Sequence, residues 1–419
     1  MSNFKEKANT AKLARLIWIF MFLVLIFSPF FPGKGTLGFY SIEWSFFFFV
    51  FFLMFVIFLT WGMRQFSPRW DSFYTIFLIY WLWGFIAIFG APNKVRAILF
   101  WGQYIPFYFI LILCISLIVT ENILNDIITK LTYLGMFFCL IVSVGFIYFR
   151  DRGLLNDFML DKFQIDLLKV LPYIELPLCV AIYRTMAGYK SRLNVLLFIL
   201  GLALVVISGS RGSCLILLGI LGLALFKSKY LGRAVLAIFL AGFLVTALLI
   251  LNPYTADRFG ELAEGRGESV SRVYTGMVAF QTMKDNPVLG IGMGNLSEYS
   301  LKALANVAVP DDVRRYWNSK NMLYETTCAP LKMGGEIGVV GFFTFFAWYF
   351  ILWRRIKVPQ KNQRGKALQT LIGLEIYVIA SFVHNFGDLG FYNYYSWVFY
   401  GVVLAAARIY GGHPKVRRN

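Results

Sequence analysis

Residues 194–226 read NVLLFILGLALVVISGSRGSCLILLGILGLALF, in which two apolar runs are separated only by Ser208-Gly-Ser-Arg-Gly-Ser213. With its flanking residues, each run approaches the roughly 20 residues that a helix needs to cross the hydrocarbon layer of a membrane. A backbone in lipid has no water to bond, so such a segment has to be helical. The stretch therefore predicts two membrane helices, at 192–209 and 212–226, joined by a short polar link.

The rest of the chain repeats this pattern from end to end. Only 15% of its 419 residues are charged, whereas about 25% are charged in a soluble globular domain. No internal repeat and no low-complexity linker divides the chain. The sequence predicts an all-α, polytopic membrane protein of about 12 transmembrane helices that forms a single domain over residues 1–419. The other predicted spans are 16–32, 43–61, 72–91, 97–120, 129–149, 168–184, 232–251, 329–353, 367–387 and 391–408.

The distribution of positive charge predicts an orientation in the membrane. The net charge is +18, but the basic residues are scattered over short connections, so nucleic acid is not an expected partner. By the positive-inside rule, the lysine- and arginine-rich connections lie in the cytoplasm together with both termini, and the long loop 252–328 lies outside. Two features oppose this orientation: connection 121–128 is acidic, and Lys94 and Arg96 fall on the predicted outer side. The four basic connections are 62–71, 184–192, 227–233 and 354–366.

The long outer loop contains one segment with helical periodicity. It begins at Ser269-Val-Ser-Arg272 and ends at Asp285-Asn-Pro287. Between these limits, apolar side chains recur at the spacing of one helix face, at Val273, Met277, Phe280 and Met283. This pattern predicts an amphipathic helix that lies against the membrane-embedded body. Such a helix either covers a core or contributes to a binding site.

Two arginines are candidates for a binding site. Arg211 lies at or just inside the outer face of the membrane, where an arginine costs about 2.5–3.5 kcal/mol on insertion scales. It either extends toward the lipid headgroups or has a cavity, a counter-charge or an anionic ligand. Arg272 provides a second guanidinium on the same predicted side. Two guanidinium groups suit phosphate oxygens because each bonds them through a planar fork, so the pair predicts a pyrophosphate site.

Other polar groups allow two interpretations each. Glu325 lies where the long loop re-enters the membrane; it could accept a proton from an attacking hydroxyl or be a surface charge. Gly290-Ile-Gly-Met-Gly294 does not follow a strand, so we interpret it as a flexible turn rather than a dinucleotide site. The remaining ionisable groups near apolar runs are functional or form buried polar pairs: Glu175, Lys332 with Glu336, and His384 with Asp388.

The five cysteines do not suggest a metal site. Four of them fall within apolar spans, only Cys328 lies near the outer surface, and no CxxC spacing occurs. We expect no metal and no cofactor.

Three motifs in this order resemble the O-antigen ligase and polymerase superfamily. They are Ser208-Gly-Ser-Arg-Gly212 between two helices, Ser271-Arg-Val-Tyr274 followed by Asp285-Asn-Pro-Val-Leu-Gly-Ile-Gly-Met-Gly294, and Gly335-Glu-Ile-Gly-Val-Val-Gly341 at the start of a helix. The resemblance covers roughly residues 195–350. It implies a GT-C-type membrane glycosyltransferase that uses polyprenyl-pyrophosphate-linked sugars.

The resemblance also implies roles for individual residues. Arg211 and Arg272 would hold the donor pyrophosphate and stabilise it as it leaves, without a metal. Tyr274 and Tyr324 are expected to contact substrate, and Glu325 is the candidate proton acceptor. The ligases of this family carry a His-Asn pair before the Glu-x-Gly-x-x-Gly stretch, and Thr327-Cys328 stands at that place here. The missing histidine favours a Wzy-type polymerase.

The expected function is therefore a polymerase that joins undecaprenyl-pyrophosphate-linked oligosaccharide repeat units at the periplasmic face of the inner membrane. It would be an inverting enzyme, because one displacement inverts the anomeric carbon. Its expected partners are the lipid-linked glycan, membrane lipid and, if a protein partner exists, a chain-length regulator or flippase. One alternative is an O-antigen ligase that transfers glycan to lipid A-core. The other is a transporter or flippase, for which an internal duplication would be expected, and none is visible.

Overall fold

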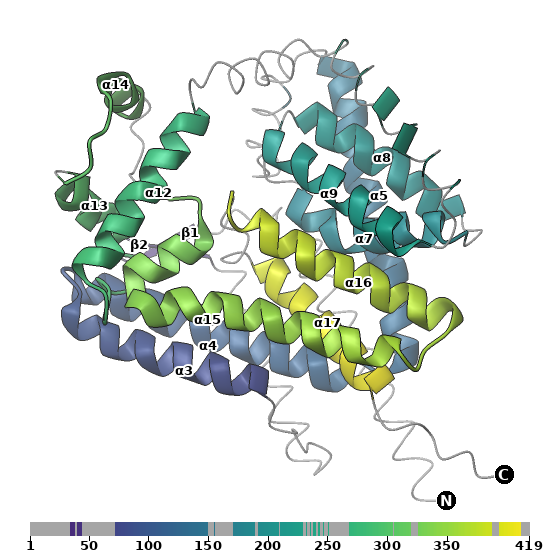
Figure 1. The fold of residues 1–419 in the computed structure, drawn as a ribbon, viewed down its shortest axis with the longest axis horizontal. Coiled ribbons are helices and arrows are strands. Elements are labelled where there is room, and N and C mark those ends of the chain that lie inside the picture. Colours follow the sequence, from purple (N-terminus) through teal and green to yellow (C-terminus); the bar gives the residue numbers. More distant parts are fainter. Residues whose placement is uncertain are drawn as a thin grey trace, which may run out of the picture.

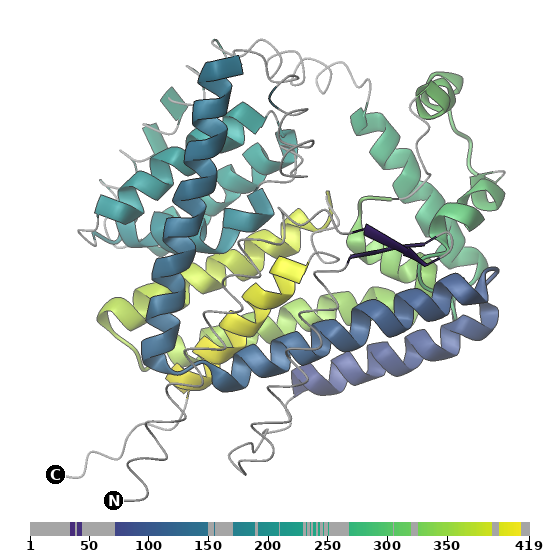
Figure 2. The ribbon, with the colours of Figure 1, turned by 180° about the vertical axis from the view of Figure 1, so that it is seen from behind.

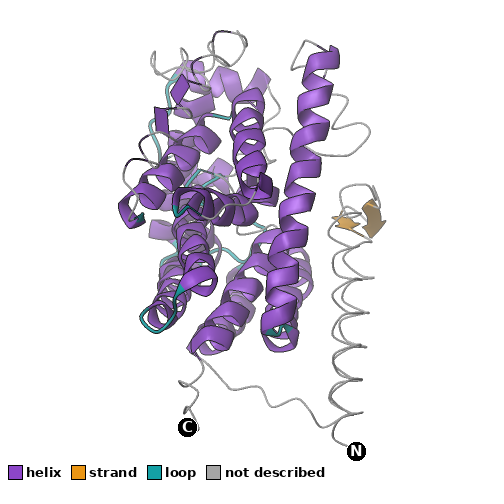
Figure 3. Cartoon of the chain, turned by 90° about the vertical axis from the view of Figure 1, so that its right-hand side faces the viewer, coloured by secondary structure: helices purple, strands orange, loops and turns teal. Residues whose placement is uncertain are grey.

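The structure of the chain, a computed structural model, contains helices and one short hairpin among the residues it describes. It describes residues 34–37, 40–43, 72–149, 171–188, 192–208, 210–228, 268–304, 306–319, 326–387 and 394–411, with Leu155 and scattered positions between 232 and 250. The predicted span 16–32, and most of 43–61 and 232–251, lie outside the described residues. The hairpin pairs β1 (Lys34–Leu37) with β2 (Tyr40–Glu43) in antiparallel register, and it was not predicted (Figure 3).

Each predicted span within the described residues contains a helix. The helices are α3 (Ser72–Ala87), continued by η2 (Ile88–Gly90), α4 (Lys94–Ile118), α5 (Glu121–Phe149), α7 (Leu171–Met186), α8 (Arg192–Ser208), α9 (Arg211–Lys227), α15 (Ala329–Gln360), α16 (Gly365–His384) and α17 (Tyr394–Gly411). The long loop contains α12 (Glu268–Asp285), α13 (Leu296–Leu304) and α14 (Asp311–Ser319).

Two of the predicted boundaries were wrong. The acidic connection 121–128 is the first part of α5, and α15 continues through Gln360 into the predicted basic connection. Both helices continue because charged residues are good helix formers, and a helix can extend beyond the lipid into water. Within the part of the chain that the structure describes, four helices are long and apolar enough to cross a membrane, namely α3 with η2, α5, α15 and α16. The number of crossings, about 12, therefore stays a prediction.

The helices form two groups that meet at α16. In one group, α3 and α4 lie beside α15 and α17; in the other, α5, α7, α8 and α9 pack together (Figure 1). Helix α16 contacts α15 on one side and α7 and α9 on the other. Seen from behind, α5 crosses the body at a steep angle to α4 (Figure 2). The helices of the long loop, α12 to α14, lie around the end of α15 that begins at Ala329 (Figure 1).

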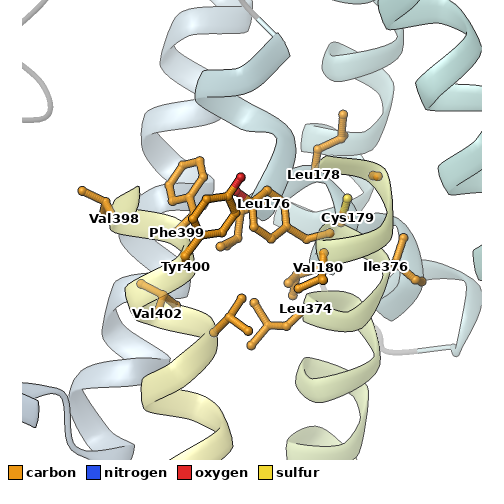
Figure 4. Close-up of a cluster of buried hydrophobic side chains, with 14 of the residues drawn as sticks. Leu176, Leu178, Cys179, Val180, Leu374, Ile376, Val398, Phe399, Tyr400 and Val402 are labelled. Atoms are coloured by element: carbon orange, nitrogen blue, oxygen red, sulfur yellow. The ribbon is translucent and has the colours of Figure 1, made fainter. Parts of the chain in front are cut away.

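Large apolar side chains fill the contacts between these helices. Trp348 and Trp397 are almost completely buried and meet edge to face, with ring centroids 5.3 Å apart. A second set joins α7, α16 and α17, where Leu176 and Val180 lie near Leu374 and Tyr400 (Figure 4). Since every described helix of the body contributes to one contiguous cluster, the two groups are parts of one core.

Charged side chains gather at one end of this core, around Glu375. Its carboxylate accepts hydrogen bonds from Lys227 Nζ at 2.6 Å and Lys357 Nζ at 3.2 Å, and also from Trp353 and Gln360. Lys227 ends α9 and Lys357 lies near the end of α15, so two of the basic connections meet here. The chain thus brings together the loops that were predicted to share one side of the membrane.

Neutralising Glu375 is expected to destabilise this end of the protein. The Glu375→Gln variant would leave Lys227, whose side chain is 16% exposed, without its counter-charge. We expect a loss of about 2–3 kcal/mol in the free energy of unfolding, less than for a fully buried pair, because Lys357 is partly exposed. Thermal unfolding in detergent measures the change. As a control, Asp126→Asn breaks the exposed pair with Lys130 and should change stability by less than about 1 kcal/mol. Equal effects of the two substitutions would contradict this expectation.

At the opposite end, α15 is broken where it meets the Gly290–Gly294 segment. Ile337 and Gly338 leave the helical conformation, Gly338 with φ of 73°. The carbonyls of Gly335 and Glu336 accept hydrogen bonds from the backbone N–H groups of Ile291, at 3.1 Å, and Gly292, at 2.7 Å. The helical bonds lost at the break are thus replaced by bonds to the long loop.

The Gly290–Gly294 segment is therefore a tightly packed joint, and the prediction of a flexible turn was wrong. All of its residues are buried. Gly290 has φ of 65°, and a Cβ atom there would lie 2.4 Å from the carbonyl carbon of Glu336. The buried side chain of Asn295 continues the joint, because it exchanges two hydrogen bonds with the backbone of Asn93 just before α4. Tertiary contacts restrain this glycine-rich turn, which sequence composition alone cannot reveal.

Candidate functional site

The polar link Ser208–Ser213 forms a tight connection between two helices, as predicted. Helix α8 ends at Ser208 and α9 begins at Arg211. Ser210 caps α9, because its Oγ accepts a hydrogen bond from the backbone N–H of Ser213 at 3.3 Å. Arg211 thus occupies the first position of α9, where the helix dipole is positive. Its side chain lies outside the described residues, so its distance from Arg272 stays a prediction.

Arg272 connects the long loop to the end of α16. It lies in the second turn of α12, its side chain is exposed, and its Nη1 donates a hydrogen bond of 2.6 Å to the carbonyl of Gly387. Gly387 follows α16 by three residues, and its own N–H bonds to the carbonyl of His384. An arginine has five N–H donors in a fixed plane. The bond to Gly387 therefore restricts the orientation of the others.

Helix α12 has the predicted limits, but the prediction of its buried face was wrong. Val273, Met277 and Phe280 are exposed, by 56%, 49% and 52%. The face that packs on α15 consists mainly of small and polar residues, Ser271, Thr275, Val278, Ala279 and Thr282. Small residues let two helix backbones approach closely, which the glycines of α15 also permit. Three of the four residues of the predicted apolar stripe therefore face outward, whereas the fourth, Met283, is partly buried beside Gly334 of α15.

Tyr274 lies on a different side of α12 from Arg272. Two residues along a helix correspond to a rotation of about 200°. Tyr274 packs against a small cluster that is formed by Val309, Val313 and Trp317 of the α14 region. The other two predicted residues, Tyr324 and Glu325, lie outside the described residues. The substrate contacts of all three stay predictions.

The start of α15 contains the predicted Lys332–Glu336 pair. Both side chains are buried, and Lys332 Nζ lies 3.9 Å from Glu336 Oε1. Cys328 caps this helix at the place where a His-Asn pair would stand in a ligase. Burial raises the pKa of the Cys328 thiol, so it is protonated at neutral pH and does not replace the histidine as a base.

A second buried pair was not foreseen as a pair. His384 Nδ1 lies 3.4 Å from Glu175 Oε2, and the side chains are 7% and 4% exposed. The sequence had suggested Asp388 as the neighbour of His384, but Asp388 lies outside the described residues. Glu175 comes from α7, 209 residues away. The only signal in the sequence was indirect: two ionisable residues lie in apolar helices, where each needs a partner.

These groups lie at the end of the body opposite the charged cluster around Glu375. Arg272 is linked to the residues just after α16, and the N–H of Ala329, at the start of α15, bonds to the carbonyl of Asn385. The ends of α12, α15 and α16 therefore meet, with His384 one turn away. Among the described residues, no group of three or more histidine, cysteine, aspartate or glutamate side chains could hold a metal ion.

Comparison with known proteins supports a family assignment for the central part of the chain. Residues 196–346 match the family described as O-antigen ligase. The matched segment begins in α8 and includes Arg211, Arg272, the glycine joint and the broken start of α15. No curated protein matches the chain. Through residues 196–346, the chain is similar to the membrane-bound O-antigen ligase and polymerase superfamily.

Proposed function

We propose that the chain is a polymerase that joins undecaprenyl-pyrophosphate-linked oligosaccharide repeat units into a surface polysaccharide at the periplasmic face of the inner membrane. The observation that carries this proposal is the bond between Arg272 and the carbonyl of Gly387, at 2.6 Å, within a chain that is similar to this family. It fixes an exposed, permanently charged side chain at the point where α12, α15 and α16 meet. A diphosphate is the ligand that such a group suits best.

In this proposal, Arg272 and Arg211 hold the donor diphosphate. A sugar hydroxyl of a second lipid-linked unit attacks the anomeric carbon, and the diphosphate leaves from the opposite side, so the carbon is inverted. Negative charge grows on the leaving oxygen, and fixed guanidinium groups in a site of low dielectric constant stabilise it. Tyr274 and Tyr324 would contact the glycans. The sequence suggests Glu325 as the group that accepts the proton of this hydroxyl.

The proposed orientation has structural support from the charged end around Glu375. The ends of α9 and α15 meet there, and Arg184 near the end of α7 bonds to Thr370 of α16 at 2.7 Å. Three basic connections thus lie at one end of the body, and Arg272 lies at the other. If the basic end is cytoplasmic, the arginine site opens to the periplasm.

A ligase is the second candidate function, because the matched family is described as O-antigen ligase. The two functions share the donor and differ in the acceptor. The absence of histidine at Thr327 and the protonated thiol of Cys328 favour the polymerase.

One reconstitution separates the two. The purified chain in liposomes is given the lipid-linked repeat unit alone, or together with lipid A-core. We expect a ladder of lengthening glycans with the donor alone and no transfer to lipid A-core. Transfer of single units to lipid A-core without a ladder would identify a ligase. Movement of the donor across the bilayer without any new glycosidic bond would indicate a flippase instead.

A further inference from the structure

A buried polar network joins α15, α16 and α17 close to the end of α16. Its members are the side chains of Tyr349, Ser381, Asn385 and Tyr400, each of which is at most 4% exposed. The hydroxyl of Tyr349 accepts a hydrogen bond of 2.9 Å from Nδ2 of Asn385, and it also bonds to the hydroxyl of Tyr400. Oγ of Ser381 lies 3.2 Å from the Tyr349 hydroxyl and 3.0 Å from the Tyr400 hydroxyl. Three helices thus share one set of hydrogen bonds.

The packing around this network is apolar, so its polar groups need an explanation. The rings of Phe345 and Phe382 are stacked, with centroids 5.8 Å apart, and Phe382 meets Phe386 edge to face at 5.2 Å. Phe382 also lies 5.3 Å from the ring of Tyr349. Apolar side chains could fill the same place with similar stability, because the net contribution of a buried hydrogen bond is small. A bonded polar network adds something else, which is one fixed arrangement of the groups that it joins.

Asn385 connects the network to the arginine site. It follows α16 directly, and the carbonyl of Ser381 accepts both its backbone N–H, at 3.2 Å, and its Nδ2, at 2.7 Å. The carbonyl of Asn385 accepts the N–H of Ala329 at 2.8 Å, where α15 begins. Two residues after Asn385, the carbonyl of Gly387 accepts the bond from Arg272. The orientation of Asn385 therefore sets both the start of α15 and the anchor of the guanidinium.

The turn between Asn385 and Gly387 is short and bonded at each residue. The N–H of Phe386 bonds to the carbonyl of Val383 at 3.1 Å, and the N–H of Gly387 bonds to the carbonyl of His384 at 3.0 Å. Every peptide of this turn is thus held by the last turn of α16. A change in the orientation of Asn385 is therefore passed on to the carbonyl of Gly387.

We propose that Asn385, held by the hydroxyl of Tyr349, is a positioning residue for Arg272. It fixes the Gly387 carbonyl, and this carbonyl orients the guanidinium toward the donor diphosphate. The inference rests on the proposed function and deepens it, because it names the residues that set the geometry of the diphosphate site. Stabilisation of a leaving group depends on donors that are already in place. A misplaced Arg272 therefore lowers kcat more than it weakens binding of the donor.

The first test is kinetic and uses the full chain in liposomes with the lipid-linked repeat unit. Asn385→Ala should lower kcat by about 10²-fold with little change in KM. In an Arg272→Ala background, the same substitution should cause little further loss, because the guanidinium through which it acts is missing. An equal loss in both backgrounds would show that Asn385 acts independently of Arg272 and would overturn the proposal. Wild-type kcat for Asn385→Ala would overturn it as well.

The second test compares two tyrosines, so it holds even if Asn385→Ala does not fold. Tyr349→Phe removes only the hydroxyl that accepts the bond from Asn385. The matched control is Tyr74→Phe, which removes a buried hydroxyl that bonds to Ser116 Oγ at 2.6 Å. Tyr74 lies in the first turn of α3, at the end away from the Gly290–Gly294 joint.

We expect both tyrosine variants to unfold at a lower temperature in detergent, because each loses a buried hydrogen bond. Only Tyr349→Phe should also lower kcat. Equal kcat values for the two variants would refute the positioning role, because the network would then contribute to stability alone. If the unmodified chain forms no glycosidic bond, the proposed function fails, and this inference fails with it. If the chain forms the bond and the two variants are equally active, only this inference fails.

Discussion

Replacing Gly290 by alanine is expected to remove on the order of 4 kcal/mol or more from the free energy of unfolding, a loss that few single substitutions reach. Gly290 has φ of 65°, where a residue with a Cβ is strained by about 1–2 kcal/mol. The added Cβ would also lie 2.4 Å from the carbonyl carbon of Glu336 and 2.5 Å from the backbone nitrogen of Ile337. These are backbone atoms, so no rotation of a side chain relieves the contact. The substitution must separate the long loop from the break in α15.

Thermal unfolding and the yield of folded protein in detergent measure this effect. The matched control is Gly219→Ala in the middle of α9, where a Cβ meets nothing within 4 Å. Alanine favours the helix by up to about 1 kcal/mol there, so the control should be neutral or slightly stabilised. If Gly290→Ala unfolds at the same temperature as the control, the joint does not have the rigidity that its hydrogen bonds imply.

Replacing Arg272 by alanine is expected to reduce polymerisation by about 10²–10³ in kcat/KM, the usual loss when one fixed donor to a developing oxyanion is removed. Arg272→Lys should restore only part of this activity. Lysine keeps the charge, but it lacks the planar fork that can bond the carbonyl of Gly387 and a phosphate oxygen together. Glycan length, measured in the liposome reaction, gives the readout.

The control for Arg272 is another arginine of the same long loop. Arg315 lies on α14, is exposed, and donates through Nε to the carbonyl of Asp311 in its own helix. Arg315→Lys and Arg315→Ala should leave glycan length unchanged. If the two arginines behave alike, the loop acts through its overall charge, and the assignment of Arg272 to the diphosphate is wrong.

The exposed stripe of α12 illustrates a limit of reading helices from sequence. The spacing of Val273, Met277 and Phe280 predicted a helix and gave its limits within about one residue, because periodicity is a property of the helix itself. The same pattern gave the wrong buried face. In water, large apolar side chains turn toward the core, whereas in a membrane protein they can face lipid while small residues make the contact. The solvent on each side of α12 decides between these outcomes.

Two other predictions from the sequence were wrong because they relied on the local composition of a segment. The Gly290–Gly294 turn was interpreted as flexible because glycine permits many conformations. Its conformation is instead fixed by α15, which lies more than 40 residues further along the chain. The acidic start of α5 was interpreted as a connection, although a charged segment at a membrane boundary can equally be the first turns of the adjoining helix. The composition of these two segments alone therefore does not show which conformation each adopts.

The sequence by itself determined the fold class and most of its helices, because the length and composition of an apolar run decide whether it can cross lipid and what backbone it must then adopt. Motifs that are continuous in the chain also singled out Arg211 and Arg272 as candidates, and their role stays a prediction. Only the tertiary structure decided which polar groups meet. Arg272 bonds to Gly387 across 115 residues, and Glu175 pairs with His384 across 209. Each buried ionisable group needs a partner, but its identity depends on how separate helices pack, and no local pattern specifies that packing.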